Sequence, residues 1–282
     1  MRPYYEDSSV QLFHGDCLEV LESVAPFVQH CITDPPYARD VYVRLSMPNT
    51  KKGSGTPDRM SIMLRPNPGS VDTSPRLARL AAGDIGAIDD LIIPVAKLLG
   101  VLVSRWTLVF SDVESCHLWK QALERGSCRY VRTGAWVKPD AMPQMSGDRP
   151  SVGFEPCTIV HRAGPMRWNG GGRQAVWTYN TCKVDRPDHP CPKPEPLMHH
   201  LVRDFTDEGD TILDPFAGSG TTLVAAKRLG RKAIGIEINE AYCEIAANRL
   251  RQGALFTPEP AAKIIAPRSL WEEQESDREE SG

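Results

Sequence analysis

The 282-residue chain lacks the long apolar segments and paired cysteines that identify several classes of protein. No apolar run approaches the roughly 18 residues that a membrane-spanning helix needs. The eight cysteines are scattered without a Cys-x-x-Cys pair, so their spacing favours neither a zinc site nor a disulfide framework. The first residues contain no apolar core of a secretion signal. We therefore expect a cytoplasmic protein that uses no metal and does not enter a membrane.

The charge is unevenly distributed, although the net formal charge is only -3. Residues 268–282 contain six acidic against two basic residues, a net charge of -4, which predicts a disordered acidic tail. Residues 38–80 contain eight basic against three acidic residues, or +5, and residues 125–203 contain twelve against six. Such basic segments are candidates for contacts with nucleic-acid phosphates, although basic loops can also be merely solvated.

Short apolar runs alternate with segments of helical spacing along the chain, which predicts an α/β fold. Strands are expected at residues 10–14, 28–33, 107–111, 130–137, 157–161, 211–213 and 232–237. Helices are expected at residues 18–24, 85–99, 117–125, 197–205, 221–229 and 241–250. Residues 38–76, 138–153 and 164–196 are expected to be loops or irregular structure, because proline, glycine and charge dominate them.

A glycine-rich turn, Asp214-Pro215-Phe216-Ala217-Gly218-Ser219-Gly220, connects a predicted strand to a predicted helix. Its glycines allow the backbone to turn tightly and to approach a ligand, and the first helical amides can face an anion. A P-loop is not expected, because GxxxxGK[ST] is missing. The turn also does not continue to GxGxxG, which favours a smaller adenosine-type ligand over a dinucleotide.

Glu237 lies 17 residues after Gly220, at the end of the next predicted strand. A carboxylate in this position can accept hydrogen bonds from both ribose hydroxyl groups of a nucleotide. A glycine turn alone can be only a tight connection. The turn, the helix, the strand and its acidic end together indicate a nucleotide-binding βαβ unit.

The tetrapeptide Asp34-Pro35-Pro36-Tyr37 follows the predicted strand at residues 28–33. Two prolines cannot continue a strand ladder or a helix interior, so the chain must leave the strand as a stiff, extended segment. The Asp34 carboxylate and the Pro35 carbonyl can accept both hydrogens of an exocyclic amine, and Tyr37 offers a flat face for stacking. A base in a duplex must flip out to reach such a site. The tetrapeptide could also be a simple turn with a capping Asp and a packed Tyr.

Together, the tetrapeptide and the segment Asp214–Thr222 resemble the catalytic and cofactor motifs of the amino-methylating DNA methyltransferases. The catalytic motif comes first, which is the order of the β group of that family. The resemblance extends from about residue 10 to residue 252. Further segments that resemble family landmarks are Gly15-Asp16-Cys17, Trp136-Val137-Lys138-Pro139, Gly147-Asp148-Arg149-Pro150, Glu155 and His189-Pro190-Cys191-Pro192-Lys193-Pro194.

The resemblance implies S-adenosylmethionine as methyl donor. It implies that Asp34 and the Pro35 carbonyl bind the target amine, that Pro36 shapes the loop and that Tyr37 stacks on the flipped base. The cofactor site is implied to hold the adenine amino group with Asp16, the ribose with Glu237 and the ammonium with Asp214. The other residues implied in the cofactor site are Cys17, Asp34 and Lys193, with Phe216, Gly218, Ser219, Gly220, Thr221 and Thr222 around the methionine end.

The resemblance also implies double-stranded DNA as the substrate. A catalytic domain is expected at residues 1–267, with a target-recognition insertion at about residues 138–186. A homodimer is a further implication, and the host would be a prokaryote or a phage. The candidate DNA contacts are basic residues of the loops: Arg39, Arg44, Lys51, Lys52, Arg149, Arg167, Arg173 and Arg186.

The fold implied by the resemblance is a Rossmann-like, doubly wound, mostly parallel seven-stranded sheet, permuted so that the cofactor half comes last. Asp in the first position of the catalytic motif favours adenine N6 as the target over cytosine N4, for which Ser is common. Relatives that methylate RNA or protein glutamine usually carry Asn in that position. A catalytically inactive DNA-binding module is another alternative, which the two intact motifs disfavour.

Overall fold

The computed structural model describes residues 1–24, 27–36, 86–182 and 192–252. Within these ranges the fold is α/β, with one nine-stranded sheet in the order β1-β2-β9-β8-β3-β4-β6-β5-β7. Tyr37, residues 38–80, Arg186 and the predicted tail at 268–282 lie outside the described residues. The strands are β1 (Tyr5–Glu6), β2 (Val10–His14), β3 (His30–Thr33), β4 (Trp106–Phe110), β5 (Cys128–Val137), β6 (Phe154–Arg162), β7 (Val176–Thr178), β8 (Thr211–Asp214) and β9 (Lys232–Glu237).

The sheet is mixed and mostly parallel. Strands β2, β9, β8, β3 and β4 are parallel to one another, whereas β6 runs antiparallel to both β4 and β5. The prediction of seven strands missed two short edge strands, β1 with two residues and β7 with three. β7 lies in the segment 164–196, which had been predicted to be irregular. Strands this short leave too few residues for an apolar alternation to be visible in the sequence.

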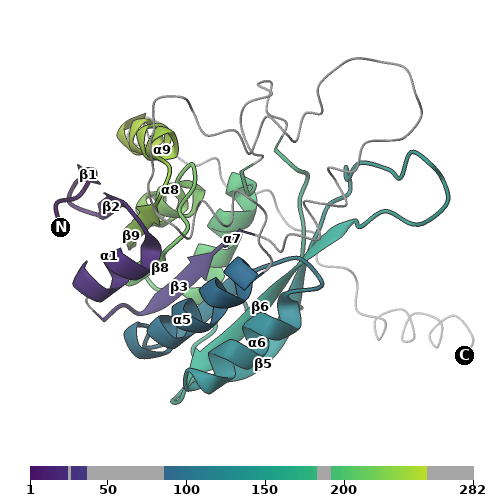
Figure 1. Cartoon of the computed structure of the whole chain (residues 1–282), viewed down its shortest axis with the longest axis horizontal. Helices are drawn as coiled ribbons and strands as arrows, with labels where there is room; N and C mark the ends of the chain where they lie inside the picture. Colours follow the sequence, from purple (N-terminus) through teal and green to yellow (C-terminus); the bar gives the residue numbers. More distant parts are fainter. Residues whose placement is uncertain (25–26, 37–85, 183–191, 253–282) are drawn as a thin grey trace, which may run out of the picture.

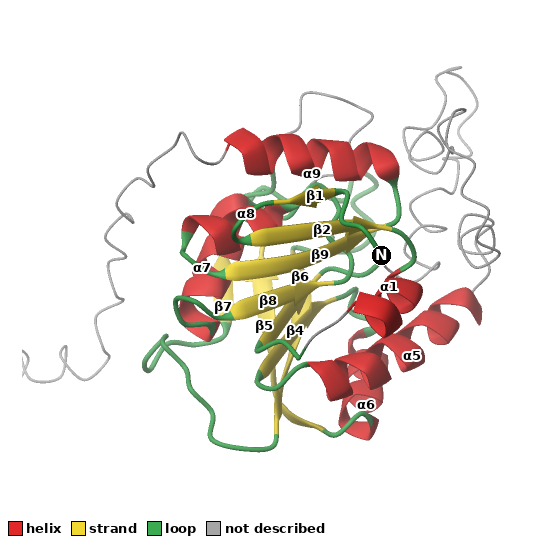
Figure 2. Cartoon of the chain, turned by 90° about the vertical axis from the view of Figure 1, so that its left-hand side faces the viewer, coloured by secondary structure: helices red, strands yellow, loops and turns green. Residues whose placement is uncertain are grey.

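Helices cover both faces of the sheet (Figures 1 and 2). Of the helices in the described residues, three pack on one face around a core that contains Phe13, Val109 and Leu213, and three pack on the other around Leu12, Leu108 and Ile212. Neighbouring residues of one strand thus enter opposite cores, as the two-residue period of a strand requires. The first three helices are α1 (Cys17–Val24), α5 (Gly86–Leu102) and α6 (Cys116–Arg125). The other three are α7 (Glu195–Phe205), α8 (Thr221–Arg228) and α9 (Glu240–Gln252).

The carboxyl ends of the parallel strands form one edge of the sheet, which we call the carboxyl edge. The segments after β2, β3, β8 and β9 all leave the sheet there, which brings Asp16, Asp34 and the glycine turn to one side of the molecule. In open α/β sheets, ligands bind at this edge. Lys138 and Glu155 also lie there, because β5 ends and the antiparallel β6 begins at this edge.

The predicted helices and long strands are confirmed, with ends that differ by a few residues. Residues 138–153 contain no helix or strand, as predicted. Among the described residues, no helix combines the length and the apolar composition needed to cross a bilayer.

Candidate active site

Asp34 and Pro35 lie directly after β3 at the carboxyl edge. Pro35 is buried and Pro36 is exposed, while the Asp34 side chain is 36% exposed, with its Oδ1 atom buried. Lys193, in the segment before α7, donates a hydrogen bond of 2.6 Å to Asp34 Oδ2. The structure thus brings together two predicted site residues that are 159 positions apart.

Lys193 belongs to a cluster of four charged groups. Its ammonium lies 2.8 Å from Glu155 Oε2, and Lys138 donates to the other oxygen of the same carboxylate. The rings of Phe110 and Trp136 lie 5.1 and 5.6 Å from the Lys193 nitrogen, within range of cation–π attraction. Lys193 is 10% exposed and Glu155 15% exposed, so water screens this pairing only weakly.

Burial opposes ionisation of both partners in this cluster, yet each stays charged. For Glu155, burial is outweighed by Lys193 and Lys138, so its pKa is lowered. For Lys193, burial is outweighed by Asp34 and Glu155, so its pKa is raised. The four groups form an alternating arrangement of two carboxylates and two ammonium groups beside the Asp-Pro-Pro segment.

Asp214 connects the strand before the glycine turn to the strand before Asp34. Its Oδ1 accepts a hydrogen bond of 2.7 Å from the Thr33 hydroxyl and one of 3.2 Å from the Phe216 amide. Only 2% of Asp214 is exposed, and this burial raises its pKa to about 6 despite the hydrogen bonds, including one from Thr222. A buried carboxylate held in this way fixes the relative position of β3 and β8 at the edge where the site lies.

The glycine turn has the backbone conformation that the sequence predicts. Gly218 and Gly220 adopt φ angles of +52° and +79°, in the left-handed region that favours glycine. A Cβ atom on Gly220 would lie 2.8 Å from the Ala246 side chain, so the turn packs closely against α9. A Cβ atom on Gly218 would meet no atom within 4 Å. Gly218 therefore faces open space, into which a ligand can fit.

Glu237 ends β9 and holds the glycine turn. Its carboxylate accepts hydrogen bonds of 2.8 Å from the amides of Gly218 and Asn239, one on each oxygen. Burial raises the pKa of Glu237, and hydrogen bonds from the backbone amides of Asn239, Gly218 and Ile238 oppose that rise. A carboxylate has about four acceptor positions, so it can also accept a hydroxyl group of a ribose.

Asp16 and Cys17 occupy the neighbouring turn after β2. The Gly15 amide donates to the Glu237 carbonyl over 3.0 Å, which places this turn beside the end of β9. Asp16 accepts a hydrogen bond from the Leu18 amide at the start of α1. Cys17 is 6% exposed and belongs to the apolar core between α1 and the sheet. The structure thus places Asp16 at the site, while the Cys17 side chain has a packing role.

Arg249 of α9 fixes the last part of the glycine turn. Its Nη1 donates to the Ser219 carbonyl over 2.7 Å and to the hydroxyl groups of Ser219 and Thr221 over 3.1 and 3.0 Å. Thr221 and Thr222 are buried at the start of α8, and Phe216 packs partly buried against the core. The predicted cofactor residues after β8 thus form one ordered turn.

The candidate DNA contacts in the described residues occupy two different places. Arg149 is 65% exposed on the loop 138–153, whose two ends reach the carboxyl edge at Lys138 and Glu155. Arg167 pairs with Asp207 near the opposite edge of the sheet, which does not favour contact with a base bound at Asp34. Arg173 pairs with Asp204 near the end of α7. Arg39, Arg44, Lys51, Lys52 and Arg186 lie outside the described residues.

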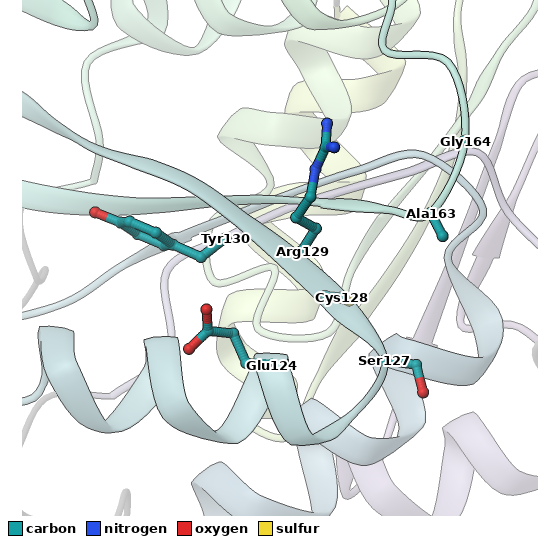
Figure 3. Close-up of a pocket in the computed structure, with 7 residues that line it drawn as sticks. All are labelled: Glu124, Ser127, Cys128, Arg129, Tyr130, Ala163 and Gly164. Atoms are coloured by element: carbon teal, nitrogen blue, oxygen red, sulfur yellow. The ribbon is translucent and has the colours of Figure 1, made fainter.

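A shallow hollow in the surface lies far from the carboxyl edge. Glu124 at the end of α6 and Arg129 and Tyr130 at the start of β5 line it, together with Gly164 after β6 (Figure 3). It contains none of the predicted site residues. No group of His, Cys, Asp or Glu suited to a metal ion is found in the parts of the chain that the structure describes.

Comparison with known proteins relates the segment that contains the glycine turn and Glu237 to DNA methylases. Residues 166–248 match a family model described as DNA methylase. The chain is 27% identical to a type II methyltransferase of Lactococcus lactis, M2.LlaDCHI, over 90% of this chain and 94% of that protein. It is 43% identical to the DNA adenine methyltransferase YhdJ of Escherichia coli, over 27% of this chain and 26% of that protein.

Solved structures share the fold. The M1.HpyAVI–SAM complex superposes with a TM-score of 0.59 at 21% identity, covering 86% of this chain and 99% of that one. The cytosine-N4-specific PvuII DNA methyltransferase superposes with a TM-score of 0.64 at 16% identity, covering 98% of this chain and 93% of that one. The sequence matches, together with the two motifs at one edge of the sheet, support membership of the N6/N4 DNA methylase family.

The sequence predictions assigned no role to three residues that the structure places at the site. In the sequence, Glu155 and Lys138 stand out only as family landmarks, and no motif includes Arg249. Glu155 and Lys138 lie on either side of a loop, and the antiparallel pairing of β5 with β6 brings them together. The only sequence signal for Lys138 and Glu155 is that each is a charged residue next to the end of a predicted strand.

Proposed function

We propose that the chain transfers a methyl group from S-adenosylmethionine to N6 of an adenine that has flipped out of double-stranded DNA. The observation that carries this proposal is the Thr33–Asp214 hydrogen bond of 2.7 Å, because it holds the Asp-Pro-Pro segment beside the glycine turn. The proposal places the protein in the cytoplasm, together with the DNA.

The residues of the carboxyl edge fit S-adenosylmethionine. The open space at Gly218 admits a ligand close to the backbone, and Glu237 presents a carboxylate to a ribose. The proposal assigns Asp16 to the adenine amino group and Asp214 to the ammonium group of the cofactor. When it is bound, S-adenosylmethionine supplies an electrophilic methyl group on a sulfonium.

Asp34 and the Pro35 carbonyl would accept the two hydrogens of the target amine. This hydrogen bonding localises the nitrogen lone pair and directs it at the electrophile. The rate gain comes mostly from positioning and from electrostatic stabilisation, so Asp34 does not have to be a strong base. Tyr37 would stack on the flipped base, which remains a prediction because it lies outside the described residues.

Adenine is favoured as the target because the first residue of the motif is Asp34, and because a named adenine methyltransferase is among the relatives. Cytosine N4 is the second candidate, and the fold similarity to the cytosine-N4-specific PvuII enzyme supports it. The homodimer and the insertion at about residues 138–186 remain predictions of the resemblance.

The test is single-molecule sequencing of DNA from cells that express the chain, which reports the modified base and its context together. We expect N6-methyladenine at one short sequence, and none with Asp34→Ala. Modified cytosine would replace the adenine assignment and keep the family. Absence of any modified base, with no calorimetric binding of S-adenosylmethionine, would favour an inactive DNA-binding module.

A further inference from the structure

Lys193 lies where its charge acts on Asp34. Its ammonium is 2.6 Å from Asp34 Oδ2 and 2.8 Å from Glu155 Oε2, so one cation bridges the two carboxylates. The resemblance had counted Lys193 among the cofactor residues, but the partners described for its ammonium are acidic side chains and the rings of Phe110 and Trp136.

We infer that Lys193 is a positioning residue for methyl transfer, which holds the Asp34 carboxylate oriented for the target amine and is itself held by Glu155. This inference rests on the proposed function, because it assigns the orientation of Asp34 a purpose in that reaction. Lys138 completes the arrangement by binding the second oxygen of Glu155. Lys193 and Lys138 act through other groups, so neither is a catalytic residue.

The two carboxylates that share Lys193 differ in exposure. The Asp34 side chain is 36% exposed, whereas that of Glu155 is 15% exposed. The more accessible carboxylate faces the place where substrate arrives, and the less accessible one anchors the lysine. A carboxylate paired on one oxygen by an ammonium keeps a fixed plane, which is what two-point binding of an amine requires.

The Lys193 ammonium interacts electrostatically with Asp34 as well as with Glu155, and both carboxylates raise the pKa of Lys193 against its burial. Asp34 also interacts electrostatically with Asp214 and Cys157, and Glu155 shares the Lys193 ammonium with it. Removal of the Lys193 charge leaves Asp34 near two other carboxylates, and like charges raise a carboxyl pKa. Removal of the Glu155 charge has the opposite effect, because Lys193 then pairs with Asp34 alone.

The experiment compares Lys193→Met and Glu155→Gln with the unchanged chain. For Lys193→Met, we expect kcat to fall about 100-fold, as for loss of a hydrogen bond to a charged group. We expect its acidic limb of kcat against pH to move up by about one pH unit or more. For Glu155→Gln, the acidic limb should move down. In both variants, the Kd for S-adenosylmethionine measured by calorimetry should change by less than about threefold, which is a small change in binding free energy.

The matched control is Lys120→Met, which removes a lysine that pairs with Glu124 over 2.8 Å on the exposed surface of α6. It should leave kcat, its pH profile and the cofactor Kd unchanged. If Lys193→Met weakens S-adenosylmethionine binding more than tenfold, the lysine belongs to the cofactor site and the inference is wrong.

Unchanged kcat and an unmoved acidic limb in Lys193→Met would also overturn the inference. If Lys193→Met does not fold, the direction of the limb shift in Glu155→Gln decides alone, and an upward shift or no shift contradicts the inference. Failure of the unchanged chain to methylate DNA would instead reject the proposed function, which is a separate outcome.

Discussion

The Thr33 hydroxyl donates a hydrogen bond of 2.7 Å to Asp214 Oδ1, across 181 positions of sequence. Thr33 immediately precedes Asp34 and ends β3, and Asp214 ends the neighbouring strand β8. Parallel pairing of β3 with β8 places these two strand ends side by side. The bond therefore couples the residue before the proposed catalytic carboxylate to the residue that begins the glycine turn.

Asp214→Asn should change how stability depends on pH. Burial raises the pKa of Asp214 from 3.8 to about 6, so the folded chain binds this proton more tightly than the unfolded chain. Stability is therefore lost as pH rises through that interval, by about 3 kcal/mol. Relative to the unchanged chain, Asp214→Asn should gain about that much between pH 4 and pH 7, measured by urea unfolding. A constant difference between the two proteins would contradict this account.

His30→Gln should have the opposite effect. Burial lowers the pKa of His30 from 6.5 to about 4, although Asp210 lies 2.9 Å from its Nε2. The folded chain keeps this imidazole neutral, so its contribution to stability is present above pH 6.5 and is lost as pH falls towards 4. Between pH 4 and pH 7, the unfolding free energy of His30→Gln should therefore rise by about 3 kcal/mol less than that of the unchanged chain.

In the unchanged chain, the contributions of Asp214 and His30 to the pH dependence of unfolding free energy should largely cancel. The two groups act in opposite directions over nearly the same pH interval. A double variant is the control, and its stability should depend on pH as the unchanged chain does. If His30→Gln alone unfolds with the same pH dependence as the unchanged chain, His30 is protonated in the folded state.

The long elements and both motifs could be predicted from the sequence, because the periodicity of buried side chains and the turn-forming residues are local signals. The predicted glycine turn and Glu237 lie together, joined by the Gly218 amide. The cluster of Lys193 with Glu155 could not be predicted, because it depends on the antiparallel pairing of β6. The position of Arg167 could not be predicted either, because its partner Asp207 lies 40 residues further along the chain.

Alanine substitutions at Gly218 and Gly220 should separate stability from cofactor binding. Gly220→Ala adds a methyl 2.8 Å from Ala246 at a φ of +79°, so it should cost about 3 kcal/mol through overpacking and strain. Gly218→Ala meets no atom within 4 Å, so only strain of about 1 kcal/mol should remain.

The effect on cofactor binding should have the opposite order, with Gly218→Ala more harmful than Gly220→Ala. The methyl group of Gly218→Ala occupies the open space proposed for S-adenosylmethionine, so the calorimetric Kd should rise about tenfold or more through steric conflict. Equal effects of the two substitutions on unfolding free energy would contradict the close packing at Gly220. An unchanged Kd in Gly218→Ala would show that S-adenosylmethionine does not occupy the space beside Gly218.

Arg149→Ala and Arg167→Ala should differ in their effect on DNA binding, although the two side chains are similarly exposed, at 65% and 70%. Arg149 lies on the loop that begins and ends beside the active-site cluster, whereas Arg167 lies near the opposite edge. A lost phosphate contact lowers the slope of log affinity against log salt concentration by about 1. We expect that change for Arg149→Ala and none for Arg167→Ala, measured by fluorescence anisotropy with duplex DNA at several salt concentrations. The reverse result would place the DNA on the other edge of the sheet and separate it from Asp34.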